Sequence, residues 1–461
     1  MSSRTRTDHD HTDLSDESVV VIGGGFTGCI TALRLAQAGH RVMLYETQSQ
    51  LGGTLRDLDV DSSAGTRRFL RGCQYADVDA PWHTALTNLV AEHLDDVSHT
   101  MGSATRQGNS MHVAHDVAVP MLGGALPARA RHVDTVSTDA VPVTLAERFA
   151  EYDAWSPWLT RYAERSGHAA NVLSARAALG MQLSRVVAAD IPSLDVLACK
   201  ARSAWADAHL AVPRSARGNS PLRALVPRSG WSPFFDALHQ HLVHEGVAVH
   251  TGVPLRVRGT DGQITVDAPA LPSSAVYVWA GSPVPLHKAF RDAFPEADSP
   301  RLDNAAMPAV HVHADVEHWS GPVPHYVQWF DTESPLLRLY VYRMKDRVQA
   351  CFECKGPLTH DAVQSLLHDV ARQCMALGLA GTTSALRFTA VEVNALRLHH
   401  LQTARDVERL SQFAQQLAAW KPNAASSVRA MIDGAWLAYG REQKLREIKN
   451  ALIERGLAVA W

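Results

Sequence analysis

The stretch VVVIGGGFTGCITALRLAQAGHRVMLYE, residues 19–46, decides the fold of this chain. Its first four residues are a short β-branched run, which is typical of a buried parallel strand. Glycines follow, then an amphipathic segment that ends at Gly39, and then a second strand from Arg41 to Tyr45. The stretch predicts a β-turn-α-β unit, the context in which a glycine-rich turn binds a dinucleotide.

Each glycine of the spacing Gly23-x-Gly25-x-x-Gly28 has its own physical role. The first permits the tight turn, the second lets a pyrophosphate approach the backbone, and the third lets helix and strand pack closely. A helix that begins with Phe26 and Thr27 then offers free N–H groups and the positive end of its dipole to the phosphates. We therefore expect these five residues to contact the cofactor.

The residues after the second strand distinguish an NAD site from an FAD site. Glu46 ends that strand, where its carboxylate accepts from ribose hydroxyls and disfavours the 2′-phosphate of NADP. The pair Gly52-Gly53 lets a second loop, with Thr54, run against the cofactor, and Arg56 is placed to meet phosphate or flavin oxygens.

This arrangement, an acid followed by GG-x(2)-R, resembles the flavoprotein superfamily of amine oxidases, protoporphyrinogen oxidase, phytoene desaturases and UDP-galactopyranose mutase. The resemblance implies FAD as the cofactor. Four later segments are similar to the same superfamily, namely 226–259, 276–286, 336–356 and 399–417, and 432–452 is the nearest candidate for its C-terminal flavin-side motif. They imply further cofactor contacts at Val253 (through its backbone, to adenine), Gly281, Gly434 and Trp436.

The chain departs from the mutases in one loop. Mutases carry Gly-Pro-His or Gly-Gly-His near the flavin, whereas the corresponding FLRGCQYAD, residues 69–77, has glutamine at position 74. Glutamine cannot serve as a proton donor or a cation as histidine can. The resemblance therefore implies a cofactor and a fold rather than one particular reaction.

Two sets of residues are candidates for catalysis or substrate binding. The loop after the GG-R motif supplies Gln74, Tyr75 and His83. A predicted strand supplies Arg338, Tyr340 and Tyr342, which alternate onto one face and suit an anionic or hydroxylated substrate. An ordinary sheet face packed on helices explains the second set equally well.

No metal site is predicted. Cys351 and Cys354 form a C-x-x-C, but residues three apart on a strand point to opposite faces, so their sulfurs should diverge. The 24 histidines are scattered along the chain.

The predicted fold class is α/β: a Rossmann-type FAD-binding domain with an inserted substrate domain made of an antiparallel sheet and helices. Residues 1–16 read as a disordered tail. We assign the FAD-binding domain to 17–80, 212–283 and 390–461. A mostly helical insertion, 81–211, and a sheet, 284–389, form the substrate domain.

The composition of the chain limits the classes of partner that it is expected to bind. A net charge of −3 and a pI near 6.8 give no electrostatic argument for nucleic acid or an anionic membrane surface. Six cysteines in 461 residues do not make a disulfide scaffold, and no signal peptide or membrane span is evident. These features predict a cytoplasmic protein with a small-molecule substrate, and they leave the oligomeric state open.

Three functions remain open at this level. The first is an FAD-dependent oxidoreductase that transfers hydride from a small polar amine, alcohol or sugar-like biosynthetic intermediate to flavin N5. The second is a redox-neutral enzyme like UDP-galactopyranose mutase, in which reduced flavin acts as the nucleophile on a sugar nucleotide. The third is a non-catalytic FAD-binding protein.

Overall fold

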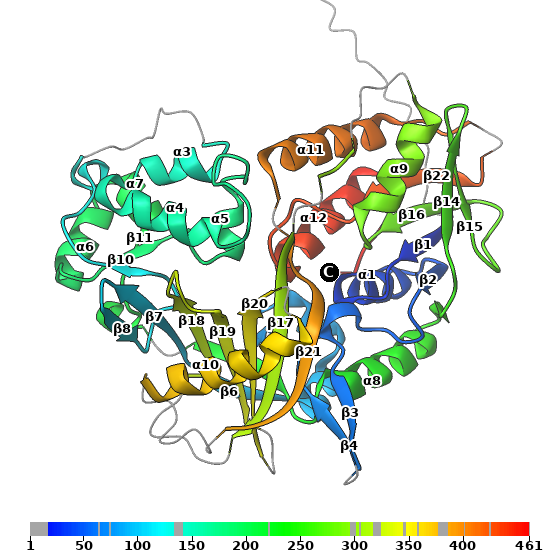
Figure 1. Ribbon diagram of the computed structural model, residues 1–461. Coiled ribbons are helices and arrows are strands. Elements are labelled where there is room, and N and C mark those ends of the chain that lie inside the picture. Colours follow the sequence, from blue (N-terminus) through cyan, green and yellow to red (C-terminus); the bar gives the residue numbers. More distant parts are fainter. Residues whose placement is uncertain are drawn as a thin grey trace, which may run out of the picture.

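The computed structural model describes residues 17–62, 65–72, 75–132, 142–219, 222–295, 301–303, 306–316, 324–343, 347–356, 359–376, 386–400, 402–423 and 426–460. The expected tail, 1–16, and the candidate Gln74 lie outside these residues. Figure 1 shows a region built on a parallel sheet, a large antiparallel sheet beside it, and a helical lobe. Within the described residues, no helix is both long and apolar enough to cross a bilayer.

The glycine-rich stretch forms the centre of a five-stranded parallel sheet. Its strand β1 is flanked by β2 on one side and β16 on the other, and every neighbouring pair runs parallel. The strands in spatial order are β13 (Ala248–Thr251), β2 (Val42–Glu46), β1 (Ser18–Ile22), β16 (Ala275–Trp279) and β22 (Val428–Asp433). Three separate parts of the sequence therefore meet in one sheet.

Both faces of this sheet are covered, which explains why its strands are apolar throughout. On one face, Val19 and Val21 pack with α1 (Phe26–Gln37), α8 (Trp231–His244) and α12 (Arg441–Glu454). On the other, Val20 and Ile22 pack with three further elements: α9 (Pro283–Ala293), α11 (Ala404–Ala419) and the hairpin of β14 (Arg256–Thr260) and β15 (Gln263–Asp267).

A seven-stranded sheet stands beside the parallel one (Figure 1). Only the β18–β7 pair in it is parallel. Its order is β21 (Leu386–His400), β17 (Ala306–Val316), β20 (Val348–Lys355), β19 (Leu336–Arg343), β18 (Tyr326–Phe330), β7 (Met101–Gln107) and β8 (Ser110–Ala114). One face packs apolar side chains against α10 (Val363–Ala376). The opposite face is called here the polar sheet face, and it carries His311, His313, Gln328, Arg338, Tyr340, Tyr342, Gln349, Cys351 and Glu353.

The helical lobe has its own apolar core, built around Phe149, Tyr152 and Leu159. It comprises α3 (Leu145–Ala150), α4 (Ser156–Glu164), α5 (Ala177–Gly180), α6 (Ser193–Lys200), α7 (Ala204–His209) and the short strands β9 (Met121–Leu122), β10 (Val186–Ala188) and β11 (Leu210–Ala211).

The remaining elements connect these regions. They are β3 (Leu58–Ser62) paired with β4 (Gly65–Phe69), the sheet of β5 (Ala76–Asp77), β12 (Leu222–Pro227) and β6 (Leu94–His99), helix α2 (Thr87–His93), and the 3₁₀ turns η1 (Gly53–Leu55), η2 (Pro81–Ala85), η3 (Ala128–Arg131), η4 (Asp153–Trp155), η5 (Ser215–Arg217) and η6 (His360–Ala362).

The structure differs from the sequence-based segmentation in three places. The segment 81–211 contains strands β6 to β11, and β7 belongs to the large sheet although its sequence MGSATRQ has little β-propensity. Strand β21 crosses the expected boundary at residue 390. Helix α9, expected with the substrate sheet from residue 284, packs on the parallel sheet.

Candidate functional site

The glycine-rich turn leaves open space where a ligand would approach. At Gly23 φ is +107°, and an added Cβ would lie 2.9 Å from the backbone nitrogen of Gly281. A Cβ on Gly28 would overlap the carbonyl oxygen of Gly23. A Cβ on Gly25, in contrast, would meet nothing within 4 Å, and no side chain caps the N-terminus of α1 there. The start of this helix is therefore accessible to an anion.

The second loop lies directly against this turn. The Gly52 N–H donates to the carbonyl oxygen of Gly24 (2.8 Å), and Gly52 forms a bridge with Gly25. Both Gly52 and Gly53 have positive φ, and a Cβ on Gly53 would lie 3.3 Å from the Gly25 Cα. Thr54 is exposed and Thr27, in the first turn of α1, is half-buried. Two backbone segments thus flank the same open space.

Glu46 fixes the shape of the turn. Its Oε2 accepts from the Gly24 N–H (2.7 Å) and its Oε1 from the Gln48 N–H (2.7 Å). The Val253 N–H donates to the Glu46 carbonyl oxygen (3.3 Å), so the predicted adenine contact lies beside the predicted ribose contact.

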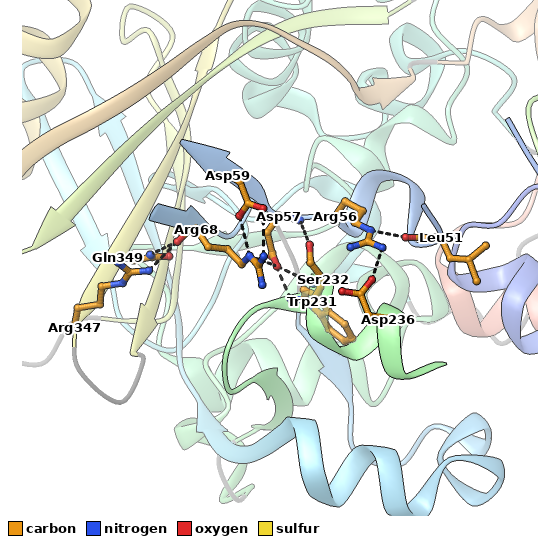
Figure 2. A network of polar contacts seen from close by, with 10 residues as sticks. All are labelled: Leu51, Arg56, Asp57, Asp59, Arg68, Trp231, Ser232, Asp236, Arg347 and Gln349. Carbon is orange, nitrogen blue, oxygen red and sulfur yellow. Dashed lines mark hydrogen bonds and ion pairs between the residues drawn. The ribbon is translucent and has the colours of Figure 1, made fainter. Parts of the chain in front are cut away.

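Arg56 contacts two groups of the protein. Its Nε donates to the Leu51 carbonyl oxygen (2.6 Å), and its Nη2 pairs with Asp236 on α8 (2.7 Å), as Figure 2 shows. In this conformation the guanidinium anchors the second loop to α8.

The predicted C-terminal contacts gather at the carboxyl ends of β16 and β22, where ligands bind in open parallel sheets. The indole N–H of Trp436 donates to the Gly281 carbonyl oxygen (3.2 Å). A Cβ on Gly434 would overlap the carbonyl oxygen of Trp279. Asp433, which sequence reasoning missed, ends β22 there, and burial raises the pKa of its carboxyl group. Its position one residue before Gly434 is the signal that was available.

Helix α12 connects the glycine-rich turn with the loop that carries Tyr75. It begins at Arg441, whose guanidinium carbon lies 5.4 Å from the centre of the Phe26 ring. The same guanidinium donates to the Tyr75 carbonyl oxygen (2.9 Å). The start of α12 therefore lies between the turn and the loop that carries Tyr75.

Tyr75 and His83 contact different partners. Tyr75 stacks on Tyr342 with ring centres 5.4 Å apart, and its hydroxyl lies 2.7 Å from the carbonyl oxygen of His325. His83 packs edge-on against Trp82 (4.0 Å) in η2, and burial lowers its pKa. Tyr75 therefore lies against the polar sheet face. The ring of His83 instead contacts Trp82, its neighbour in η2.

Arg338, Tyr340 and Tyr342 lie on the polar sheet face, as predicted, and all three are well buried. Tyr342 donates to the Gly72 carbonyl oxygen, and the Tyr340 hydroxyl lies 3.3 Å from the Glu353 carboxylate. The Arg338 guanidinium lies 4.0 Å from Glu353.

Arg338 also joins the sheet to the helical lobe. It donates to Gln328 Oε1 (2.9 Å) and to the carbonyl oxygen of Gly180 in α5. The cavity beside it is small, about 20 Å³, and Tyr162 and Arg165 of the lobe contribute to its lining. The lobe therefore closes over this end of the sheet.

The two sulfurs of the C-x-x-C diverge as predicted. Cys351 lies on the polar sheet face, and Cys354 packs in the core beneath α10. Cys351 instead has His311 and His313 as neighbours, a grouping that the sequence analysis did not predict.

The turn and the parallel sheet define the class of domain. Residues 21–92 match the family model described as "NAD(P)-binding Rossmann-like domain". Together with the five parallel strands, this match establishes the predicted Rossmann-type dinucleotide-binding domain.

Solved structures share the fold over nearly the whole chain. Reduced UDP-galactopyranose mutase is 13% identical, with 96% of each chain covered and a TM-score of 0.63. Cyclohexylamine oxidase from Brevibacterium oxydans IH-35A is 12% identical, with 96% of this chain and 99% of that chain covered and a TM-score of 0.56. A double mutant of putrescine oxidase is 13% identical, with 96% of this chain and 99% of that chain covered and a TM-score of 0.55. The predicted resemblance to this superfamily is confirmed at the level of the fold.

One curated relative matches over a short stretch. Carotenoid 3,4-desaturase from Haloarcula japonica is 51% identical over 49 residues, which are 11% of this chain and 10% of that protein. The chain therefore matches about a tenth of the length of this relative.

Proposed function

We propose that this chain is an FAD-dependent oxidoreductase acting on a small polar amine, alcohol or sugar-like intermediate. One observation carries the proposal: the backbone of Gly52 lies against Gly24 and Gly25 beside the open start of α1. A nucleotide site with this second backbone segment suits FAD, which is longer than NAD. Its pyrophosphate would lie at the start of the helix.

The residues present fit such a cofactor. The N–H groups at the start of α1 suit the pyrophosphate, and Glu46 and Val253 are adjacent where the ribose and adenine would lie. Gly281, Gly434 and Asp433 border the carboxyl ends of the neighbouring strands. Bound FAD supplies hydride acceptance, while the protein supplies position and electrostatics.

The polar sheet face and the loop before it would form the substrate side. Tyr342 holds the Gly72 carbonyl and Tyr75 stacks on Tyr342, so we assign both to positioning this loop. Arg338 and Tyr340 share the buried carboxylate of Glu353. Because these side chains are buried, their charges and dipoles would act strongly on a polar molecule bound beside them.

The test uses spectra of the purified full-length chain, followed by mixing with amines, alcohols and sugar nucleotides under anaerobic conditions. We expect a yellow protein whose flavin absorption bleaches with one substrate class without added reductant. Turnover only after dithionite reduction, with no net electron transfer, would instead establish the mutase-type reaction. A colourless protein that remains colourless with excess FAD would overturn the proposal altogether.

A further inference from the structure

Three side chains able to ligate a metal ion lie together on the polar sheet face. His311 and His313 come from β17 and Cys351 from β20, and each is 1% exposed. Their ligand atoms all lie within 4.8 Å of one another. The strand geometry explains the cluster, because residues two apart share a face and His313 stands directly opposite Cys351.

Glu392 completes the cluster from the third strand. It stands opposite His311 in the register of β17 and β21. Its Oε2 lies 3.1 Å from His313 Nε2 and 3.5 Å from His311 Nδ1. Its Oε1 accepts from Arg71 Nη2 (2.7 Å) and Nε (3.0 Å), and Oε2, which contacts the histidines, also accepts from Arg71 Nε (3.2 Å).

His311 gives an independent indication of a ligand. Its Nε2 has no hydrogen-bond partner, and its Nδ1 has only the 3.5 Å contact with Glu392 among the described residues, although the side chain is almost fully buried. Leaving a buried polar atom unpaired costs about 1–3 kcal/mol. A bound ion would satisfy one of these nitrogens.

We propose that His311, His313 and Cys351 bind one Zn²⁺ ion, with the Glu392 carboxylate as the fourth ligand. Imidazole, thiolate and carboxylate donors select zinc over magnesium or calcium. A tetrahedral zinc site holds its ligand atoms roughly 3.5 Å apart, so atoms that lie within 4.8 Å of one another need to close by no more than about 1.3 Å.

The surroundings of the cluster suit this role. The Gly72 N–H lies 3.5 Å from the Cys351 sulfur and points at it as a donor, and Arg71 holds Glu392. Hydrogen bonds of this kind orient metal ligands and adjust their charge. Because Gly72 and Arg71 belong to the loop that precedes Tyr75, zinc would also fix that loop on the sheet.

The experiment titrates metal-free, full-length protein with Co²⁺ and then Zn²⁺. The chain carries His9→Ala and His11→Ala so that the histidines of the N-terminal segment do not compete. We expect one equivalent of Co²⁺ to produce tetrahedral d–d bands at wavelengths beyond the flavin absorption, with a thiolate charge-transfer band that Zn²⁺ abolishes. Absence of stoichiometric binding, or cobalt bands without thiolate character, overturns the proposal.

Variants then locate the site. Cys351→Ser and His313→Asn should each lower the affinity for Zn²⁺ by at least about tenfold. Cys354→Ser, on the opposite face of the same strand, is the matched control and should bind as the parent does. Unchanged binding by Cys351→Ser contradicts the assignment, and the cobalt spectrum of the parent decides the matter if a variant does not fold.

Discussion

Asp57 and Ser232 exchange two hydrogen bonds across 175 residues of sequence. The Ser232 N–H donates to Asp57 Oδ2 (2.7 Å), and the Asp57 N–H donates to Ser232 Oγ (3.2 Å). The Trp231 N–H donates to the other carboxylate oxygen (3.1 Å), as Figure 2 shows. Asp57 therefore caps α8 from the loop after the Gly52-Gly53 pair, and a Cβ on Gly230 would overlap its carboxylate.

Asp57→Ala should lower the free energy of unfolding by about 1–3 kcal/mol, because two buried N–H groups at the start of α8 lose their acceptor. Urea unfolding followed by circular dichroism measures the change. Asp59→Ala is the control, since this more exposed carboxylate pairs with Arg68 and its loss should cost no more than about 1 kcal/mol. Equal effects from the two variants would contradict the capping role.

Gly25→Ala should reduce the FAD bound after purification at least tenfold and leave the melting temperature of the FAD-free protein unchanged. The added methyl group meets no protein atom within 4 Å, and it would occupy the space in which we expect the pyrophosphate to bind. Flavin absorbance per mole of protein measures the effect. Gly180→Ala, which also has open space around its Cβ, should retain the parent flavin content. Full flavin content in Gly25→Ala would place the cofactor elsewhere.

Arg338→Met should destabilise the protein by about 3–5 kcal/mol, because it leaves the Glu353 carboxylate buried without its cation. The double variant Arg338→Met/Glu353→Gln should recover part of that loss, which chemical denaturation of both proteins measures. Arg372→Met removes a more exposed pair with Asp369 and should change stability by no more than about 1 kcal/mol. If the destabilisation of the double variant equals the sum of those of Arg338→Met and Glu353→Gln, the two residues are not coupled.

His209 should make the helical lobe sensitive to acid. Burial lowers its pKa from 6.5 to about 4. Below pH 6.5 the unfolded chain takes up a proton that the folded chain does not, so stability is lost as the pH falls from about 6.5 to 4. His209→Gln should flatten the fall in melting temperature over this interval, whereas the exposed His368→Gln should leave it unchanged. Parallel profiles for parent and His209→Gln would contradict the buried neutral state.

Much of the Rossmann-type domain was predictable because the sequence features that define it are local. The run Val19–Ile22, the spacing Gly23-x-Gly25-x-x-Gly28 and the acid at the end of β2 each constrain the backbone within a few residues. The same locality explains why Arg338, Tyr340 and Tyr342 were placed on one strand face correctly.

The ion pair that Arg56 makes in the structure depends on a distant residue and was not visible in the sequence. Nothing near position 56 indicates that its guanidinium pairs with Asp236, 180 residues away. Strand β7 has little β-propensity of its own and is defined by pairing with β8 and β18.

By itself the sequence determined the Rossmann-type turn, its parallel strands and the alternation of strands in the seven-stranded sheet, because backbone sterics and side-chain periodicity act over a few residues. Only the tertiary structure decided which side chains share the polar sheet face. His311, Cys351 and Glu392 meet there because strand register brings together residues up to 81 positions apart, and register is set by packing of the whole sheet.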